Sequence, residues 1–199
     1  MKKVYFSDKY GLTQTVLDKI KTNTRRSISN KLWKKWDEVK TADSTEEDLI
    51  RFLLDNSPYK LGEVVAVAQA YREIAHPDGF LDERYEVKDD FVSGWANKLF
   101  VRADLMPHQI RITNVRVERL QDISDEDCMA EGVELNQRQY EYDGLKLYFV
   151  RNLGHWRMFG CDNFKTPRQA YAALIDKISG KGTFESNPYV FVYEFELIK

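Results

Sequence analysis

Apolar residues recur at helical spacing in two stretches of the chain. The first stretch predicts a helix from about Leu12 to Ile20, after a short strand in KVYF. The second, TPRQAYAALIDKISGKG, carries a capping threonine, a proline at the first helical position and a glycine after the last turn. It predicts a helix from Thr166 to Gly180. A shorter helix is predicted in SDEDCMAEG, so Glu131 lies at its C-terminal end.

Other stretches have the apolar patterns of β-strands. The run from Val64 to Ala68 is uninterrupted and rich in valine, which predicts a strand buried on both faces in the centre of a sheet. IRITNVRVERL alternates apolar and polar residues, but the parity changes near Asn114, as a β-bulge would cause. KLYFV and NPYVFVYEFELI are two further predicted strands. Strands therefore outnumber long helices, and the pattern predicts an α+β fold around a mixed, curled sheet or small barrel.

Two segments interrupt this pattern. Residues 30–57 are charged and helix-favouring, with a capping-box-like STEE before an apolar run, and they predict a helical insertion. Residues 75–93 contain Pro, Gly and many acids without a clear period, and they predict a surface excursion. With 199 residues and 43% hydrophobic content, the chain has the size and composition of one globular domain. We expect a single domain, residues 1–199, with insertions at 30–57 and 75–93.

The charge balance excludes a polybasic nucleic-acid binder. Thirty basic and 32 acidic residues give a formal net charge of -2, so any contact with nucleic acid must be local. The first residues contain no signal-peptide pattern, and no window approaches the roughly 18 apolar residues of a membrane span. Two cysteines are too few for a disulfide scaffold. We therefore expect a cytoplasmic protein without a membrane partner.

Neither a metal site nor a cofactor site is predicted. The histidines and cysteines show no metal-ligand spacing, and the sequence has no glycine-rich phosphate loop and no GxGxxG motif. The residues concerned are His76, His108, His155, Cys128 and Cys161.

The densest candidate chemistry lies in KIKTNTRR, residues 19–26, which has four basic side chains and two threonines in eight positions. One interpretation is a solvated basic turn, because charge runs usually face water and cations favour the C-terminal end of a helix. The other is a site for phosphate or a nucleotide, in which Arg25 and Arg26 contact the phosphate. The composition of the segment leaves both interpretations open.

Four stretches in the same order resemble ASCH domains of the PUA-like superfamily, in particular those encoded in phages and prophages. VLDKIKTNTRR resembles the family's helix followed by G-x-K-x-x-T-x-R, with Lys19 in place of the glycine. The other three stretches are YKLGEVVAVAQAY, ITNVRVERLQDISDEDCMAEGV and AALIDKISGKGTFESNPYVFVYEFELI. The two insertions lie outside the resemblance. It implies a PUA-like mixed or antiparallel β-barrel with a few flanking helices.

The resemblance also implies a function and site residues. ASCH domains are associated with binding RNA or modified nucleosides in a cleft beside the first helix, and one branch hydrolyses the amide of 4-acetylcytidine. In that branch the motif lysine is the base, the motif threonine is the nucleophile and a glutamate assists. The matching positions here are Lys21, Thr24 and Glu131. Glu126 and Asp127 are alternative positions for the glutamate, because helix spacing leaves that alignment open.

Catalysis by these residues requires a particular backbone geometry. A threonine needs an adjacent base, and a lysine acts as one only where burial or a neighbouring cation lowers its pKa. Three positions apart, Lys21 and Thr24 meet on one side of a helical turn but point to opposite faces of an extended strand. The catalytic interpretation therefore predicts a bend within KTNTRR, after Ile20, that brings Lys21 and Thr24 together. Lys19 replaces a glycine that could adopt a positive φ, so it is expected to introduce strain or to narrow the cleft.

Binding without catalysis needs only cations for phosphate, an aromatic ring for stacking and a few polar groups that recognise a base edge. Trp156 is a further stacking candidate. The predicted binding residues are Lys21, Arg25, Arg26, Tyr71 and Trp95.

Three functions remain as hypotheses. The first is a PUA-like domain that binds RNA or a modified nucleoside in a basic cleft beside the first helix. The second is an amidohydrolase that acts on an acylated cytidine-type nucleoside through the lysine, threonine and glutamate named above. The third is a phage-related protein-interaction module that uses the insertions. An exposed apolar patch would mark the third function, around Trp33, Trp36, Leu53 and Leu54.

Overall fold

The computed structural model describes residues 1–75, 80–82, 85–86, 93–154 and 163–199. Its strands are β1 (Lys3–Val4), β2 (Asn23–Ser27), β3 (Val64–Val67), β4 (Phe80–Asp82), β5 (Tyr85–Glu86), β6 (Gln109–Arg119), β7 (Glu134–Leu135), β8 (Tyr148–Phe149) and β9 (Tyr189–Leu197). Its α-helices are α1 (Leu12–Leu17), α2 (Asn30–Val39), α3 (Glu46–Asp55), α4 (Tyr71–Ile74), α5 (Asp125–Ala130), α6 (Gln137–Asp143), α7 (Pro167–Ser179) and α8 (Thr183–Ser186). The predicted α+β class is confirmed.

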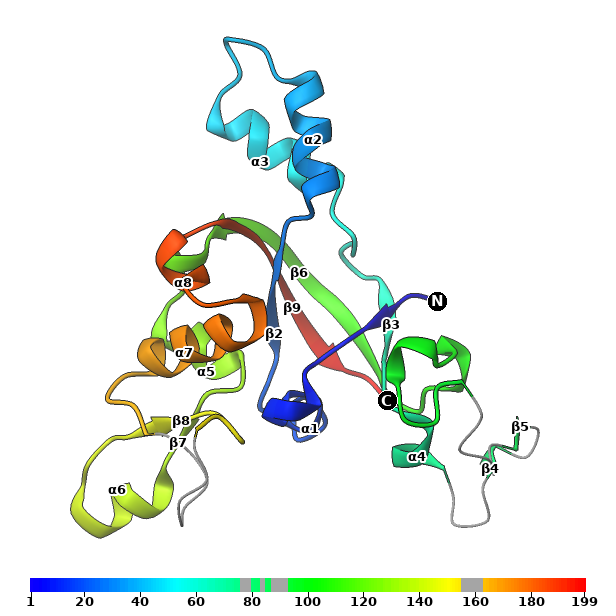
Figure 1. Cartoon of the computed structure of the whole chain (residues 1–199), viewed down its shortest axis with the longest axis vertical. Coiled ribbons are helices and arrows are strands. Elements are labelled where there is room, and N and C mark those ends of the chain that lie inside the picture. The colour runs from blue at the N-terminus through cyan, green and yellow to red at the C-terminus, as the bar shows by residue number, and fades with distance from the viewer. Residues whose placement is uncertain (76–79, 83–84, 87–92, 155–162) are drawn as a thin grey trace.

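A five-stranded mixed sheet with the order β1-β3-β6-β9-β2 forms the middle of the molecule (Figure 1). β1 runs parallel to β3, and the other neighbouring strands in this sheet pair antiparallel. The valine-rich strand β3 is internal, as its apolar run predicts, but β6 occupies the middle position. β3 is buried on its outer edge because the N-terminal strand β1 pairs with it.

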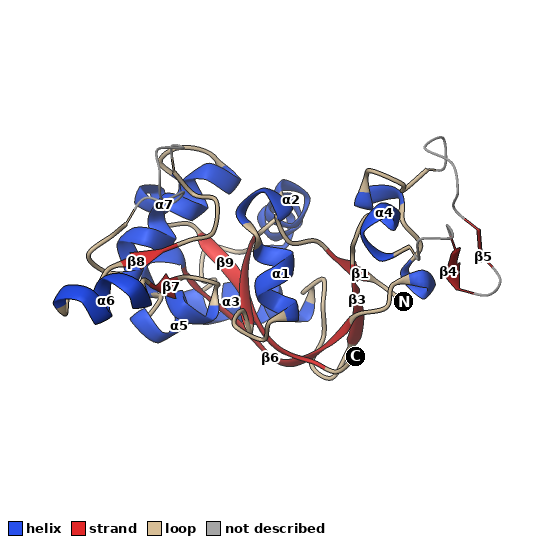
Figure 2. Ribbon diagram, turned by 90° about the horizontal axis from the view of Figure 1, so that it is seen from below, coloured by secondary structure: helices blue, strands red, loops and turns tan. Residues whose placement is uncertain are grey.

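The pairing of β6 with β9 contains the predicted irregularity. Ile112 lies opposite Phe195, and the next pair is Asn114 with Glu194, so Thr113 is an extra residue on β6. The change of parity near Asn114 is therefore confirmed as a bulge. A bulge bends and twists the strand that carries it, which contributes to the curl of the sheet seen in Figure 2.

Helices gather at both ends of this sheet. Figure 2 shows α5, α6 and α7 at one end and α4 at the other, with α1 between them. The sequence specifies two of the helix beginnings through side-chain caps: Ser124 accepts a hydrogen bond from the backbone N–H of Asp127, and Thr166 accepts one from Gln169. α7 buries an apolar face against the main core. This packing places α5 and α7 next to β2.

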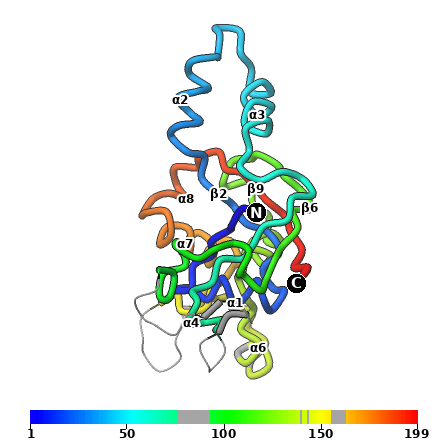
Figure 3. Tube along the Cα trace, turned by 90° about the vertical axis from the view of Figure 1, so that its right-hand side faces the viewer, coloured from blue at the N-terminus to red at the C-terminus, as the bar shows by residue number. Residues whose placement is uncertain are grey.

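Residues 30–57 form a helical hairpin, α2 and α3, that extends beyond the sheet (Figure 3). A capping box between Thr45 and Asp48 begins α3. Leu53 is fully buried, and the Trp36 ring lies 5.3 Å from the Phe52 ring. Trp33, Trp36 and Leu54 are half-buried. Leu53 thus belongs to the main core, Trp33 packs against this core and Trp36 packs on Phe52, so none of the four named residues is fully exposed.

The predicted excursion at residues 75–93 lies largely outside the described residues. Within it, the structure describes β4 and β5, which pair antiparallel. Across the described ranges, no helix has both the length and the apolar character needed to cross a membrane.

Candidate functional site

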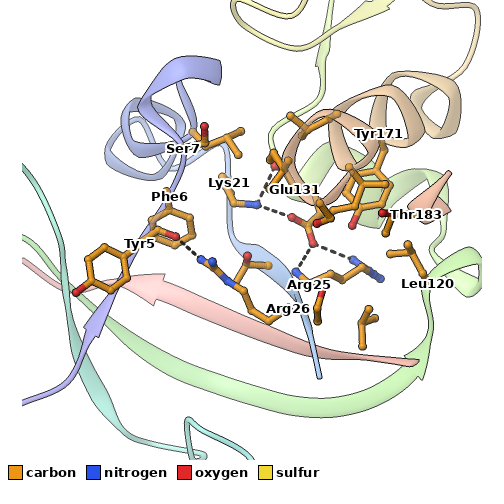
Figure 4. Close-up of a pocket in the computed structure, with 18 residues that line it drawn as sticks. Tyr5, Phe6, Ser7, Lys21, Arg25, Arg26, Leu120, Glu131, Tyr171 and Thr183 are labelled. Carbon is orange, nitrogen blue, oxygen red and sulfur yellow. Dashed lines mark hydrogen bonds and ion pairs between the residues drawn. The ribbon is translucent and has the colours of Figure 1, made fainter. Parts of the chain in front are cut away.

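A cavity of about 350 Å³ lies where α1, β2, the end of α5 and α7 meet (Figure 4). Lys21, Thr24, Arg26 and Glu131 all line it, although Glu131 is more than a hundred positions away along the chain. Its apolar walls include Phe6, Leu12, Leu120, Tyr171 and Leu174. The residues that the resemblance places in a site therefore converge on one cavity.

The backbone turns at the end of α1, before Lys21, and continues into the extended strand β2 (Asn23–Ser27). The helical turn that the catalytic interpretation requires between Lys21 and Thr24 is therefore not formed. Lys19 N–H donates to the Val16 carbonyl and Ile20 N–H donates to the Thr15 carbonyl, which together form a Schellman motif. Lys19 occupies the left-handed position of this motif with φ 60°, where glycine is preferred. The glycine position of the resemblance is thus a left-handed turn, and the lysine adopts it.

Gly132 lets the segment after α5 approach this turn closely. Its φ is 102°, and a Cβ atom there would lie 3.2 Å from both Leu12 Cδ2 and Thr15 Oγ1. The Thr22 N–H also donates to the Ala130 carbonyl at the end of α5. These contacts bring the C-terminal end of α5 beside the start of β2.

Lys21 and Glu131 form a buried ion pair. Lys21 Nζ lies 2.5 Å from Glu131 Oε2 and also donates to the Glu131 backbone carbonyl at 2.8 Å. Their side chains are 1% and 6% exposed. Burial disfavours the ammonium more than Glu131 favours it, so the pKa of Lys21 is below its usual value. A carboxylate near the negative end of a helix dipole requires a cation, and Lys21 supplies it.

Arg25 is fully paired with carboxylates. Its Nη2 lies 2.6 Å from Glu118 Oε1 and 2.6 Å from Asp127 Oδ2, and its Nη1 lies 3.4 Å from Glu131 Oε1. Its backbone N–H also donates to Glu131 Oε1 at 2.6 Å. Burial opposes the charged form, but Glu131, Asp127 and Glu118 together hold the pKa of Arg25 above its usual value. Arg116 bonds to both Asp127 and Glu118, so these carboxylates are shared in one network.

Arg26, the next residue, has a different environment. Its Nη2 donates to the Tyr5 carbonyl at 2.5 Å, and its guanidinium carbon lies 5.4 Å from the Phe6 ring centroid. Within the described ranges it has no ion pair with a carboxylate, and its buried Nε has no hydrogen-bond partner. Burial lowers the pKa of Arg26. Arg26 is therefore a largely desolvated cation with an unused donor.

Two buried residues of the cavity, Thr24 and Tyr171, also have hydroxyl groups without a partner among the described residues. Thr24 is buried on β2 and makes no side-chain hydrogen bond to any described residue. The Tyr171 hydroxyl is buried without a partner on α7, and burial raises the pKa of Tyr171 well above its usual value. A buried polar group without a partner costs about 1–3 kcal/mol. This cost applies to the Tyr171 hydroxyl, so that group points to a bound molecule that completes it.

The structure does not bring Tyr71 and Trp95 to this cavity. Tyr71 is 1% exposed in a second core cluster, where its hydroxyl accepts a hydrogen bond from the Arg102 N–H, and Trp95 packs against the same cluster. Trp156 lies outside the described residues. Of the alternatives for the glutamate, Glu126 is exposed and Asp127 pairs with Arg25. Glu131 is the carboxylate that contacts Lys21.

Phe6 and Tyr171 are cavity residues that sequence reasoning did not single out. Lys21 Nζ and the Arg26 guanidinium both lie over the Phe6 ring, at 5.8 and 5.4 Å from its centroid. Phe6 stands in a short apolar strand pattern, which is the ordinary pattern of a core residue. Tyr171 lies three positions before Leu174, so it shares the apolar face of α7. The polar hydroxyl of a tyrosine on an otherwise apolar helix face was the sequence signal that could have identified Tyr171 as a cavity residue.

Comparison of the chain with protein-family models, curated proteins and solved structures gives no match. The resemblance to ASCH domains therefore stays a prediction. Among the residues that the structure describes, no group of three or more His, Cys, Asp and Glu side chains could hold a metal ion.

Proposed function

We propose that the chain is a PUA-like, ASCH-type domain that binds a nucleoside, free or as a unit of RNA, in the Lys21 cavity. The observation that carries the proposal is the convergence of Lys21, Thr24, Arg26 and Glu131 on one cavity beside the first helix. The resemblance assigns site roles to Lys21, Thr24 and Glu131 and includes Arg26 in its motif, and Glu131 comes from a segment far from the other three in sequence.

The size and lining of the cavity support a small ligand. Ligand pockets typically measure about 300–1,000 Å³ and combine apolar walls with a few placed polar groups. At about 350 Å³ the cavity is at the small end of this range, which favours a single base or nucleoside. Phe6 and Tyr171 supply aromatic walls, and Thr24 and Tyr171 supply hydroxyl groups.

We also propose that the sheet curls toward a PUA-like barrel and that the protein is cytoplasmic. One feature of the structure supports each of these. β1 and β2 are the two ends of the strand order, yet Arg26 of β2 donates to the Tyr5 carbonyl just after β1. This contact brings residues at the two edges of the sheet together, which supports a sheet that curls toward a barrel. Cys128 is a free, buried thiol, which is compatible with a reducing cytoplasm.

Titration calorimetry of cytidine and of 4-acetylcytidine against the purified chain tests the proposal. We expect a Thr24→Val variant, which keeps the shape of the side chain but removes the hydroxyl, to lose about tenfold in affinity. Thr113→Val, on the exposed bulge of β6, is the matched control and should bind as the original chain does. If neither nucleoside nor a short oligoribonucleotide binds, or if Thr24→Val binds unchanged, the proposal is wrong.

A second candidate function is hydrolysis of the amide of an acylated cytidine-type nucleoside. It is favoured by the lowered pKa of Lys21 together with the unused hydroxyl of Thr24 in the same cavity. In this mechanism Thr24 Oγ attacks the acyl carbon and Lys21 accepts its proton. The C–N bond then breaks as Lys21 returns this proton to the leaving amine, and water hydrolyses the acyl-threonine ester to release the carboxylic acid and the threonine hydroxyl.

Release of acetate from 4-acetylcytidine is the measurement for this second candidate. Turnover should disappear in both Lys21→Ala and Thr24→Ala, while Thr113→Ala should keep it. Turnover that persists in Thr24→Ala would exclude the threonine as nucleophile. An absence of turnover at high protein concentration, with binding intact, would leave only the binding function.

A further inference from the structure

The two adjacent arginines of the cavity differ in whether carboxylates of the chain already pair with their guanidinium groups. Arg25 contacts Glu118, Asp127 and Glu131, so its charge is compensated within the chain. Arg26 contacts only the Tyr5 carbonyl and the Phe6 ring within the described ranges, and its buried Nε donates to nothing. A desolvated cation without a counter-ion is unfavourable, and the penalty is removed when an anion binds beside it.

The remaining free polar groups of the cavity are hydroxyls. Ser7, Thr24 and Ser27 line it, and their side chains make no hydrogen bond to other described residues. Glu131, the carboxylate of the lining, is occupied on both oxygens by Lys21 and Arg25. The cavity thus offers unused N–H and O–H donors and no unused carboxylate, so it is complementary to a ligand rich in acceptor oxygens.

We propose that Arg26 binds a phosphate group of the ligand, so that the cavity takes a phosphorylated nucleoside in preference to an uncharged one. This inference rests on the proposed nucleoside-binding function. A guanidinium binds phosphate through paired N–H groups with a geometry that few other side chains offer. Thr24 shares the face of β2 that carries Arg26, and its hydroxyl and that of Ser7 are available to share the phosphate oxygens.

Tyr171 has a separate part in this assignment. In Figure 4 it lies on the opposite side of the Lys21–Glu131 pair from Phe6, over which Arg26 is placed. Its unpartnered hydroxyl is therefore assigned to the uncharged part of the ligand. Arg26 at one end of the cavity then contributes to the affinity for phosphate, and Tyr171 at the other end contributes independently to the affinity for the base or sugar.

The phosphate has two possible sources, a free nucleotide or an RNA strand. Ser27 lines both the cavity and a neighbouring groove that Lys31 and Lys35 also line. A strand that leaves the cavity past Ser27 would place its next phosphates near these lysines. Short oligoribonucleotides and mononucleotides distinguish the two sources.

The experiment measures the affinities of cytidine, cytidine 5′-monophosphate, cytidine 3′-monophosphate and a short oligocytidylate by calorimetry. In the original chain, at least one monophosphate should bind about tenfold more tightly than cytidine. Arg26→Gln should reduce this preference to roughly twofold or less, while Tyr171→Phe should weaken cytidine and the monophosphate equally and keep the preference. Arg26→Lys, which keeps the charge without Nε, should give an intermediate preference and serves if Arg26→Gln does not fold.

Each outcome separates this inference from the function on which it rests. Equal affinity for cytidine and both monophosphates, or a preference that survives Arg26→Gln, overturns the inference and leaves nucleoside binding standing. Absence of binding by every probe overturns the nucleoside function itself. A monophosphate preference with no further gain for the oligonucleotide assigns the phosphate to a free nucleotide. A further gain that Lys31→Gln with Lys35→Gln removes, without effect on the monophosphate, assigns it to RNA.

Discussion

Two basic segments of this chain look alike in sequence and have opposite environments in the structure. KIKTNTRR, residues 19–26, enters the cavity, where Lys21 and Arg25 are buried. NKLWKKW, residues 30–36, forms most of α2, where Lys31, Lys34 and Lys35 are exposed. Charge density therefore does not decide whether a basic segment meets water.

The difference lies in the carboxylates that other segments supply. Glu118, Asp127 and Glu131 lie about a hundred positions after β2 in the sequence. The fold places them beside Lys21 and Arg25. α2 packs its apolar side against α3 and leaves its lysines in water. A cation is buried only where another part of the fold places a carboxylate beside it. Among the described residues, this happens for residues 19–26 and not for the lysines of α2.

The largest expected effect comes from removing the shared carboxylate of the buried segment. Glu131→Gln leaves Lys21 and Arg25 buried with fewer charge partners, and we expect it to lower the free energy of unfolding by about 3–5 kcal/mol. Glu38→Gln, on exposed α2, is the matched control and should change it by less than about 0.5 kcal/mol. Urea denaturation measures both. Equal effects of the two variants would remove the contrast between the segments.

The pH dependence of stability is the next largest effect. The pKa of Lys21 is lowered by burial, whereas in the unfolded chain it returns to about its ordinary value of 10.5. Between these two values the unfolded chain binds more protons, so the free energy of unfolding rises with pH, by at most about 1.4 kcal/mol per unit. The stabilising contribution is complete above the unfolded pKa and is lost as pH falls through the folded pKa.

Lys21→Met should remove this rise, and urea denaturation at a series of alkaline pH values measures it. Tyr171 and Tyr193 have raised pKa values and act in the opposite direction at high pH, but they are present in both proteins. The difference between the two profiles therefore isolates Lys21. Parallel profiles would show that the pKa of Lys21 does not change on folding.

The same substitution in the two segments should have opposite signs. Lys19 has a φ of 60°, so Lys19→Gly relieves an unfavourable backbone conformation and should stabilise the fold by about 1 kcal/mol. Lys34 lies inside α2, where Lys34→Gly should destabilise by about 1 kcal/mol. Thermal unfolding monitored by circular dichroism compares the two. A destabilising Lys19→Gly would mean that the lysine side chain contributes more than the turn costs.

The smallest effect is expected at the exposed lysines. Lys31→Gln with Lys35→Gln should change the free energy of unfolding by no more than about 0.5 kcal/mol, because both side chains are exposed and form no ion pair with described residues. Urea denaturation of the double variant measures this. A loss above 1 kcal/mol would show that α2 depends on these charges for its packing.

Helices, caps and bulges were predictable from sequence where they depend only on residues of the same segment. Ser124 and Thr166 cap helices at the expected positions, and the parity change near Asn114 marks a bulge. The end of α1 was predicted later than it occurs, because the left-handed Lys19 that ends it lacks the glycine that normally signals such a turn.

The candidate site was predictable in part. The spacing of Lys21, Thr24 and Arg26 and the position of Glu131 were identified from sequence, and they line one cavity. The stacking candidates Tyr71 and Trp95 do not line it, because an aromatic residue near a strand has the same pattern whether it faces a core or a ligand.

By itself, the sequence determined the helical hairpin, α5 and α7 with their caps, the bulge and the charged segment that reaches the site, because these depend on neighbouring residues and on periodicity. Only the tertiary structure decided that Arg25 is compensated while Arg26 is not, and that Lys21 is buried against Glu131. Adjacent arginines have the same local sequence signal. Their difference arises because alternate residues of a strand point to opposite faces, and one face of β2 meets the carboxylates of β6 and α5 while the other meets Phe6.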